Sequence, residues 1–184
     1  YKTMHNPKTD WCFKTEPDAT INGRSINYPR GKTLGGSSSI NGLLYIRGQS
    51  QDYDMWRQQG NIGWGWDDVL PYFIKSENQE RGSNEFHGIN GPLSVSDIRI
   101  KLDILDEFRN AAEEVGIPKI KDFNTGDNFG CDYFQVTEKN GLRCSTAVGY
   151  LNPVKRRPNL KIEVKAHVKQ INFEGKKAIG VSYW

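Results

Sequence analysis

The chain has 184 residues, of which 36% are hydrophobic and 26% are charged, and its formal net charge is +3 at pH 7. This composition suits one medium-sized domain, or a piece of a larger one, with enough apolar residues for a core. Positive and negative charges are mixed along the chain, so no sustained basic surface for nucleic acid or for an anionic membrane is indicated. No apolar run approaches the length that crosses a bilayer, so we expect neither a nucleic-acid partner nor a membrane span.

Residues 29–45, PRGKTLGGSSSINGLLY, combine a double glycine, three serines and an Asn-Gly step. Gly35 and Gly36 have no Cβ, so the backbone there can approach a ligand closely and adopt φ angles that other residues avoid. The serines offer hydroxyl groups and a helix N-cap, and the apolar residues after them predict the first turns of a buried helix. Because the start of a helix attracts anions, this segment is predicted to cradle a phosphate.

Two alternatives exist for this segment. Gly31-Lys32-Thr33 matches the end of the P-loop pattern, but the first glycine of that pattern would fall at Ile26, and no glycine-rich stretch or strand lies between, so a P-loop is disfavoured. A glycine-serine surface loop without a ligand is the usual meaning of such a composition. It is less favoured here because the apolar residues that flank the loop are expected to hold it in a core.

The rest of the chain divides into elements by apolar spacing and by its glycines and prolines. In chain order we predict a polar helix, a helix with Asp67 as N-cap and Pro71 in its first turn, a loop, a short strand and an amphipathic helix. An exposed loop, a short helix, a strand and, after a bulge, a hairpin complete the series. The ranges, in the same order, are 52–59, 66–74, 80–92, 93–95, 103–115, 122–132, 145–151, 160–168 and 171–183.

Cysteines and histidines give no sign of a metal site. Cys12, Cys131 and Cys144 are odd in number and form no Cys-x-x-Cys pair, so neither a structural zinc site nor a disulfide scaffold is indicated. Cys131 and Cys144 are expected to be ordinary buried thiols, with pairing to a cysteine outside this chain as the alternative. His87 precedes a glycine and is interpreted as a structural hydrogen-bonding residue beside a turn, not as a general base.

Several further motifs accompany the glycine-serine loop in a fixed order. They are 45–48, 52–56, 65–73, 87–93, 135–137, 140–147 and 158–160. Together with the loop, they resemble the glucose-methanol-choline (GMC) family of flavoenzymes, whose first signature corresponds to residues 31–54 here. The last three are most similar to the insect glucose dehydrogenase branch of that family. The resemblance covers most of the chain, from residue 29 onward.

The resemblance implies a mixed α/β fold: an incomplete FAD/NAD(P)-binding domain of the Rossmann type with part of a substrate-side domain. It assigns residues 1–77 and 141–184 to portions of the FAD-binding domain and residues 78–140 to the substrate-side portion. The G-x-G-x-x-G unit that opens such domains and the C-terminal catalytic domain of the family are both absent from these 184 residues. The chain is therefore expected to be an internal fragment.

The resemblance also implies FAD as the cofactor, with the loop and the Asn-Gly step against its pyrophosphate and flavin. Some members of the family attach the flavin covalently through a histidine just before the asparagine. Ile40 occupies that position here, so non-covalent FAD is expected. Val168 matches a strand residue whose backbone pairs with the adenine. The residues implied to contact the cofactor are Thr33, Gly35, Gly36, Ser37, Ser38, Asn41, Gly42, Leu43, Leu44 and Val168.

The reaction implied for the complete protein is oxidation of the CH–OH group of an alcohol or sugar, with hydride transfer to the flavin and a quinone-type electron acceptor. The catalytic histidine of the family lies near its C-terminus, so no catalytic residue is assigned here and the chain alone is expected to be inactive. Secretion is expected from the resembled branch. The alternative is a catalytically degenerate relative that acts as a binding or structural protein. A self-contained binding domain is disfavoured, because without the first βαβ unit the sheet lacks its central strands.

Overall fold

The computed structural model describes residues 3–184, and the chain divides into two compact units, Tyr1–Asn152 and Pro153–Trp184. The first unit contains most of the helices and several short strands, and the second is dominated by one hairpin. The fold thus mixes helices and strands, as predicted. The three portions expected from the resemblance, with limits at residues 77 and 140, stay a prediction.

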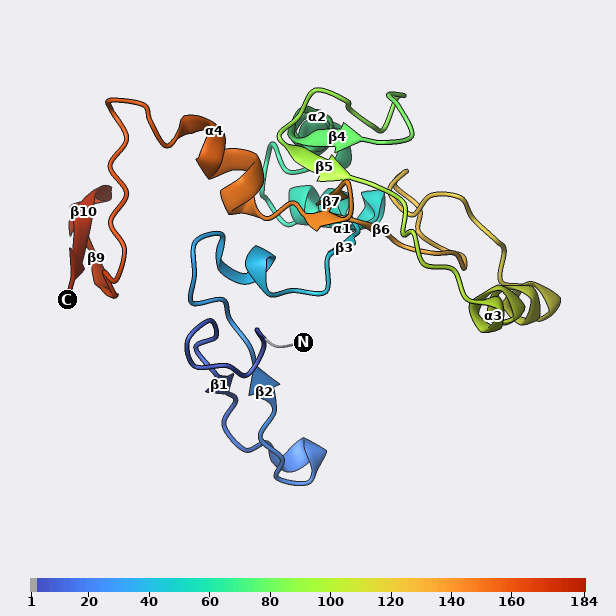
Figure 1. The fold of residues 1–184 in the computed structure, drawn as a ribbon, viewed down its shortest axis with the longest axis horizontal. Coiled ribbons are helices and arrows are strands. Elements are labelled where there is room, and N and C mark those ends of the chain that lie inside the picture. The colour runs from blue at the N-terminus through green and yellow to red at the C-terminus, as the bar shows by residue number, and fades with distance from the viewer. Residues whose placement is uncertain (1–2) are drawn as a thin grey trace. The chain divides into compact units, whose positions relative to one another are not determined.

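The strands of the first unit are two or three residues long and pair as separate ladders. Three of the ladders are antiparallel, and the third in the following list is parallel. The pairs are β1 (Phe13–Lys14) with β2 (Asn27–Tyr28), β3 (Leu44–Tyr45) with β6 (Gln135–Val136), β4 (Glu77–Gln79) with β5 (Leu93–Val95), and β7 (Glu138–Lys139) with β8 (Leu142–Arg143). Figure 1 shows β4 and β5 side by side, and β5 confirms the predicted strand. The β3–β6 ladder fixes the chain just after the Asn-Gly step.

Three predicted helices are confirmed to within two residues at each end: α1 (Ser50–Gln58), α2 (Trp66–Ser76) and α3 (Asp103–Glu114). Glycines in the left-handed region follow two of them, with φ of +100° at Gly60 after α1 and +88° at Gly116 after α3. Glycine adopts this conformation without the Cβ penalty, which explains why these helices end there.

The N-cap predicted for α2 is wrong, because the N-cap is Gly65 and not Asp67. The helix begins at Trp66, and the carboxylate that accepts the backbone N–H of Gly65 (3.0 Å) belongs to Asp68, not to Asp67. Because the N-cap precedes Asp67, Pro71 lies in the second turn and not in the first, and the proline ring removes one backbone hydrogen bond there.

The buried helix predicted after the three serines is also wrong. The serines form η2 (Gly36–Ser39), a single turn of 3₁₀ helix, and the chain then leaves the helical conformation. Leu43 has a φ of +70°, which a continuing helix does not permit, and Leu44 begins β3. Ile40 is buried, but Leu44 is 55% exposed, so only part of the segment lies in a core.

Other short helical segments are η1 (Ala19–Ile21), the π-helix η3 (Ala147–Leu151) and α4 (Asn152–Val154). The π-helix η3 lies within the short helix predicted over 145–151, and α4 follows it directly. The loop predicted to be exposed over 122–132 is only partly so. Asn124 within it is 2% exposed, because its side chain accepts the backbone N–H of Arg47 at 2.7 Å.

Among the described residues the core is small and largely polar. Large apolar side chains remain open to solvent on α3, where Ile104 is 72% and Phe108 68% exposed. The buried apolar side chains are Ile40, Val95, Ala112, Val136 and Cys144. Cys144 is thus a buried thiol, as predicted, while Cys131 is half-buried.

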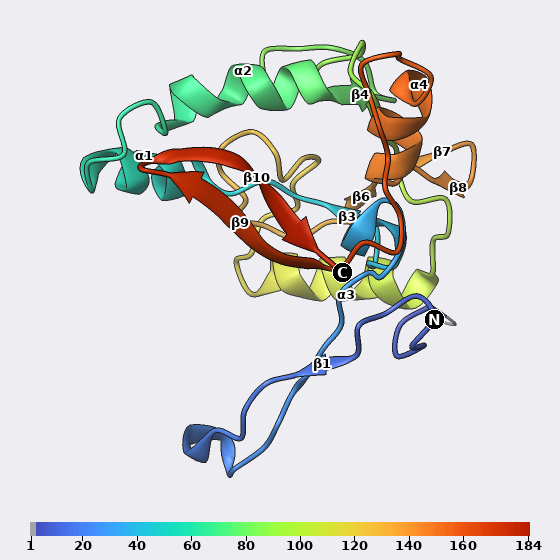
Figure 2. The ribbon, with the colours of Figure 1, turned by 90° about the vertical axis from the view of Figure 1, so that its left-hand side faces the viewer.

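In the second unit, β9 (Val168–Glu174) and β10 (Lys177–Tyr183) form an antiparallel hairpin, which Figure 2 shows. This confirms the predicted hairpin. The pairing register of its strands is irregular. The strand predicted over 160–168 is wrong for residues 160–166, because no neighbouring strand pairs with them in the described part of the chain. His167 exchanges backbone hydrogen bonds with Trp184 and so extends the hairpin.

Over residues 3–184, no helix combines the length and the apolar character needed to cross a bilayer. In the same range, no group of three or more His, Cys, Asp or Glu side chains is placed to hold a metal ion.

Candidate functional site

The glycine-serine loop folds so that some of its glycines are packed and others face open space. A Cβ on Gly31 would lie 2.1 Å from the carbonyl oxygen of Gly36, and one on Gly35 would lie 2.4 Å from Ser39 Oγ. At Gly36 and Gly42, by contrast, a Cβ would meet no atom within 4 Å. The packed glycines shape the loop, and the open ones leave backbone accessible to a ligand.

The backbone of the same loop supplies free donors. In the part of the chain that the structure describes, the N–H groups of Gly35, Ser37 and Gly42 donate no backbone or side-chain hydrogen bond. Unpaired N–H groups beside open glycine backbone are suited to the oxygen atoms of an anion. We call residues 33–44 the cradle.

The serine hydroxyls, in contrast, serve the cradle itself. Ser38 Oγ donates to the carbonyl of Gly35 at 2.5 Å, and Ser39 Oγ donates to that of Leu34 at 2.8 Å. Ser37 Oγ accepts the backbone N–H of Gly31 at 3.2 Å. The hydroxyls expected to face a ligand therefore hold the loop in shape, and the backbone N–H groups are the better ligand donors.

Residues about a hundred positions later fasten the cradle. Arg143 Nη1 donates to the carbonyl of Ser38 (2.9 Å) and to Oδ1 of Asn41 (2.6 Å), and its Nη2 donates to the carbonyl of Asn41 (2.8 Å). The backbone N–H of Thr146 donates to Ser38 Oγ at 2.9 Å, and the Thr146 hydroxyl donates to the carbonyl of Gly35 at 3.2 Å. These contacts join two sequence motifs that are far apart in the chain.

The structure thus places nine of the ten predicted contact residues in one continuous cradle. The tenth, Val168, begins β9 in the second unit and is 52% exposed. Its role against an adenine stays a prediction.

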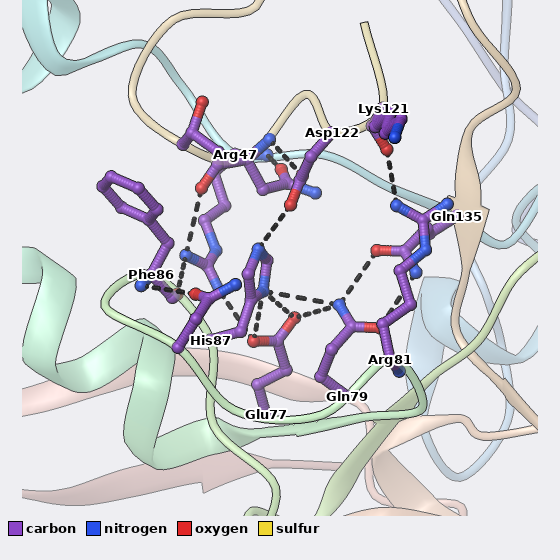
Figure 3. Close-up of polar contacts among 12 residues, drawn as sticks. Arg47, Glu77, Gln79, Arg81, Phe86, His87, Lys121, Asp122 and Gln135 are labelled. Atoms are coloured by element: carbon purple, nitrogen blue, oxygen red, sulfur yellow. Dashed lines mark hydrogen bonds and ion pairs between the residues drawn. The ribbon is translucent and has the colours of Figure 1, made fainter.

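A second constellation lies beyond β3, around a carboxylate that is fully buried. Glu77, with no exposed surface, pairs with Arg47 Nη2 (2.9 Å) and with His87 Nδ1 (2.8 Å). On the other side of the imidazole, His87 Nε2 lies 2.7 Å from Asp122 Oδ2. Figure 3 shows His87 between the two carboxylates. We call these four residues the ionic cluster.

Uncharged groups surround the ionic cluster and form hydrogen bonds beside it. Arg47 Nη1 donates to the carbonyl of Phe86 at 2.8 Å. Gln79, on β4 like Glu77, exchanges two side-chain hydrogen bonds of 2.9 Å with Gln135 on β6. Since Arg47 follows β3 closely and Gln135 pairs with that strand, the cluster fixes the end of the segment that begins with the cradle.

Two carboxylates hold His87 in its charged form. Desolvation by burial is the largest single influence and lowers the pKa of His87, but the hydrogen bonds to Asp122 and Glu77 and their charges outweigh it. Together they raise the pKa from 6.5 to about 9. Burial raises the pKa of Asp122, whereas the His87 hydrogen bond and further contacts lower it. The net effect is a pKa below the ordinary value of 3.8. With both ring nitrogens engaged, His87 is a structural residue, as predicted, and not a free general base.

The ionic cluster was missing from the sequence prediction apart from His87. Its members come from four separate segments, at no spacing that a local motif would reveal. The only signal was that His87 and Arg47 each lie in a motif of the resembled family.

The chain is similar to several known proteins. The family model described as GMC oxidoreductase, for the N-terminal domain, matches residues 14–184. An alcohol dehydrogenase [acceptor] of Pseudomonas putida is 43% identical over 180 residues, which are 97% of this chain and 33% of that protein. Mitochondrial choline dehydrogenase of Mus musculus is 40% identical over 176 residues, covering 96% of this chain and 30% of that protein.

Among solved structures, an FAD-dependent oxidoreductase from Chaetomium thermophilum superposes with a TM-score of 0.88 at 31% identity, over 99% of this chain and 34% of that one. The chain spans about a third of the length of the curated relatives it matches. These relations confirm the predicted fold class.

Proposed function

Because the chain belongs to the GMC oxidoreductase family, we propose that it forms part of the FAD site of an oxidoreductase acting on CH–OH groups. Family membership and the FAD-dependent structural neighbour support FAD as the cofactor. The relatives named alcohol and choline dehydrogenases support oxidation of an alcohol group.

The cradle is the observation that carries this proposal. Open backbone at Gly36 and Gly42 lets an extended ligand approach, and the unpaired N–H groups of Gly35, Ser37 and Gly42 supply donors for pyrophosphate oxygens. The residues present therefore fit the group. When bound, FAD supplies the hydride acceptor. Ile40 carries no nucleophile, so the proposed attachment is non-covalent.

The substrate and the electron acceptor are proposed from resemblance alone. We assign an alcohol or sugar donor, with a glucose-type sugar first, and a quinone-type acceptor. Secretion of the protein is proposed on the same ground. The names of the relatives add choline and simple alcohols to the candidates to be tested.

No catalytic acid or base is assigned within the chain. His87 is enclosed by Glu77 and Asp122, with only 2% of its surface exposed, so it does not reach a substrate hydroxyl. We propose that the catalytic base belongs to a part of the protein outside these residues, and that the chain alone does not turn over.

The test is anaerobic reduction of the flavin in the full-length protein. The oxidised absorbance should bleach on addition of one member of a panel of glucose, choline and primary alcohols, and a quinone should restore it. Flavin that is bound but never reduced by any member would favour the catalytically degenerate relative. A purified protein that neither retains nor rebinds FAD would contradict the proposal.

A further inference from the structure

We propose that Arg143 is a positioning residue of the cofactor site, which holds the Asn41 side chain so that its amide NH₂ group is presented to the flavin. The inference rests on the function proposed above and adds a residue and a role to it.

The orientation of the Asn41 amide follows from its neighbours. The backbone N–H of Leu43 (3.1 Å) and Nη1 of Arg143 (2.6 Å) converge on one atom of this side chain. Both groups can only donate, so the atom that receives them is the oxygen Oδ1. The amide nitrogen Nδ2 is the other end, and it makes no hydrogen bond within residues 3–184.

The free amide points to a ligand because of where it lies. Asn41 is exposed and precedes Gly42, whose N–H is unpaired and whose missing Cβ leaves open space. The amide NH₂ of Asn41 and the backbone N–H of Gly42 are thus free donors at successive residues, available to acceptor atoms of a ligand.

Arg143 does more than touch the amide. The same guanidinium binds the carbonyls of Ser38 and Asn41, which lie at the end of η2 where the helix leaves its last acceptors without partners. Three bonds from one planar group fix the backbone and the side chain of Asn41 together. A lysine has a single ammonium and no planar fork, so it does not reproduce this geometry.

The charge of Arg143 fits the same role. All the acceptors in its hydrogen bonds are uncharged oxygen atoms. Desolvation by burial lowers its pKa, and its three hydrogen bonds bring no negative charge to it. An anionic cofactor, or one that gains negative charge on reduction, would supply that compensation.

The test compares FAD dissociation constants of the full-length apoprotein, measured by quenching of flavin fluorescence. Arg143→Lys should weaken FAD binding about tenfold, the equivalent of one hydrogen bond to a charged or well-placed group. In an Asn41→Ala background the same substitution should weaken binding distinctly less than in the wild type, because the effect through the Asn41 side chain is already lost and only the bonds to the two carbonyls remain. Arg99→Lys, which changes an exposed arginine paired with the half-buried Glu138, serves as the control and should leave the constant unchanged.

Asn41→Asp provides an independent variant. It keeps Oδ1 for both donors and replaces the amide NH₂ by a second oxygen, so its thermal unfolding midpoint should equal or exceed that of the wild type. Its FAD affinity should nevertheless fall about tenfold or more. This variant decides the matter if Arg143→Lys does not fold.

Wild-type FAD affinity in Asn41→Asp, or independent additive effects of Arg143→Lys and Asn41→Ala, would overturn the inference while leaving the proposed function intact. Wild-type apoprotein that binds no FAD would instead remove the proposed function itself.

Discussion

At the scale of single residues, Gly36 combines a left-handed backbone conformation with open space on the side where a ligand would bind. Its φ is +53° and a Cβ there would project into open space. Gly36→Ala should therefore cost about 1 kcal/mol of stability from backbone strain. It should also weaken FAD binding well beyond what that strain explains, because the methyl group occupies the space reserved for the cofactor. A urea titration and an FAD titration measure the two effects separately.

Gly23 is a matched control for this substitution. Its φ is +67°, and a Cβ there would also meet no atom within 4 Å, but the residue lies outside the cradle. Gly23→Ala should show the same loss of stability with unchanged FAD affinity. Equal FAD affinities for the two variants would show that Gly36 does not face the cofactor.

His87 makes the stability of the protein depend on pH. Because its pKa is raised from 6.5 to about 9 in the fold, the stabilisation is complete below pH 6.5 and is lost as the pH rises through 9. The lowered pKa of Asp122 gives a contribution that is present above pH 3.8 and lost as the pH falls further. The cluster should therefore be most stable between these limits.

The measurement is the free energy of unfolding in urea at pH 6 and pH 10. The wild-type protein should lose on the order of 3 kcal/mol more over this interval than His87→Gln, which has no imidazole to titrate. Parallel pH profiles for the two proteins would mean that His87 is not held as a cation.

The sequence predicts the roles of some site residues and not of others. The cradle was predictable because its glycines, serines and asparagine are neighbours in the chain, so the local pattern carries the information. Arg143 and the ionic cluster were not, because Glu77, His87 and Asp122 come together only after distant segments have folded. The structure adds a role for the serine hydroxyls that the sequence did not reveal, since the loop itself uses them, and their contact with the cofactor stays a prediction.

At the scale of elements, the first turn of α2 distinguishes two adjacent aspartates. Both Asp67 and Asp68 gain from the helix dipole, but only Asp68 accepts the N–H of Gly65. Asp68→Ala should cost about 1 kcal/mol and Asp67→Ala distinctly less. Thermal unfolding of the two variants checks this, and a larger loss for Asp67→Ala would contradict the capping assignment.

Helices were predicted more accurately than strands, for a physical reason. The apolar spacing in α1, α2 and α3 and the glycines after α1 and α3 act within one turn of the chain. A two-residue strand such as β3 exists only because Val136 is opposite Leu44, which no local pattern specifies. The stretch 160–166 shows the converse: its apolar alternation is suited to a strand, but no strand among the described residues pairs with it.

At the scale of the whole molecule, the amount of exposed apolar surface is the dominant property. Ile104, Phe108 and Val115 on and after α3 are each more than two-thirds exposed, while few apolar side chains are buried in the described residues. Burial of apolar surface is the main driving force of folding. The 184-residue chain expressed alone should therefore bind a hydrophobic dye strongly and unfold without a cooperative transition. A sharp two-state transition would show that it folds independently.

The central claim is that residues 33–44 hold FAD through their backbone. Hydrogen–deuterium exchange of the full-length apoprotein, with and without FAD, measures this most directly, because the N–H groups of Gly35, Ser37 and Gly42 have no other partner in the described structure. The account predicts that FAD slows exchange in peptides covering the cradle, whereas η1 (Ala19–Ile21) and its surroundings exchange as before. Saturating FAD with unchanged exchange across residues 33–44 would contradict it.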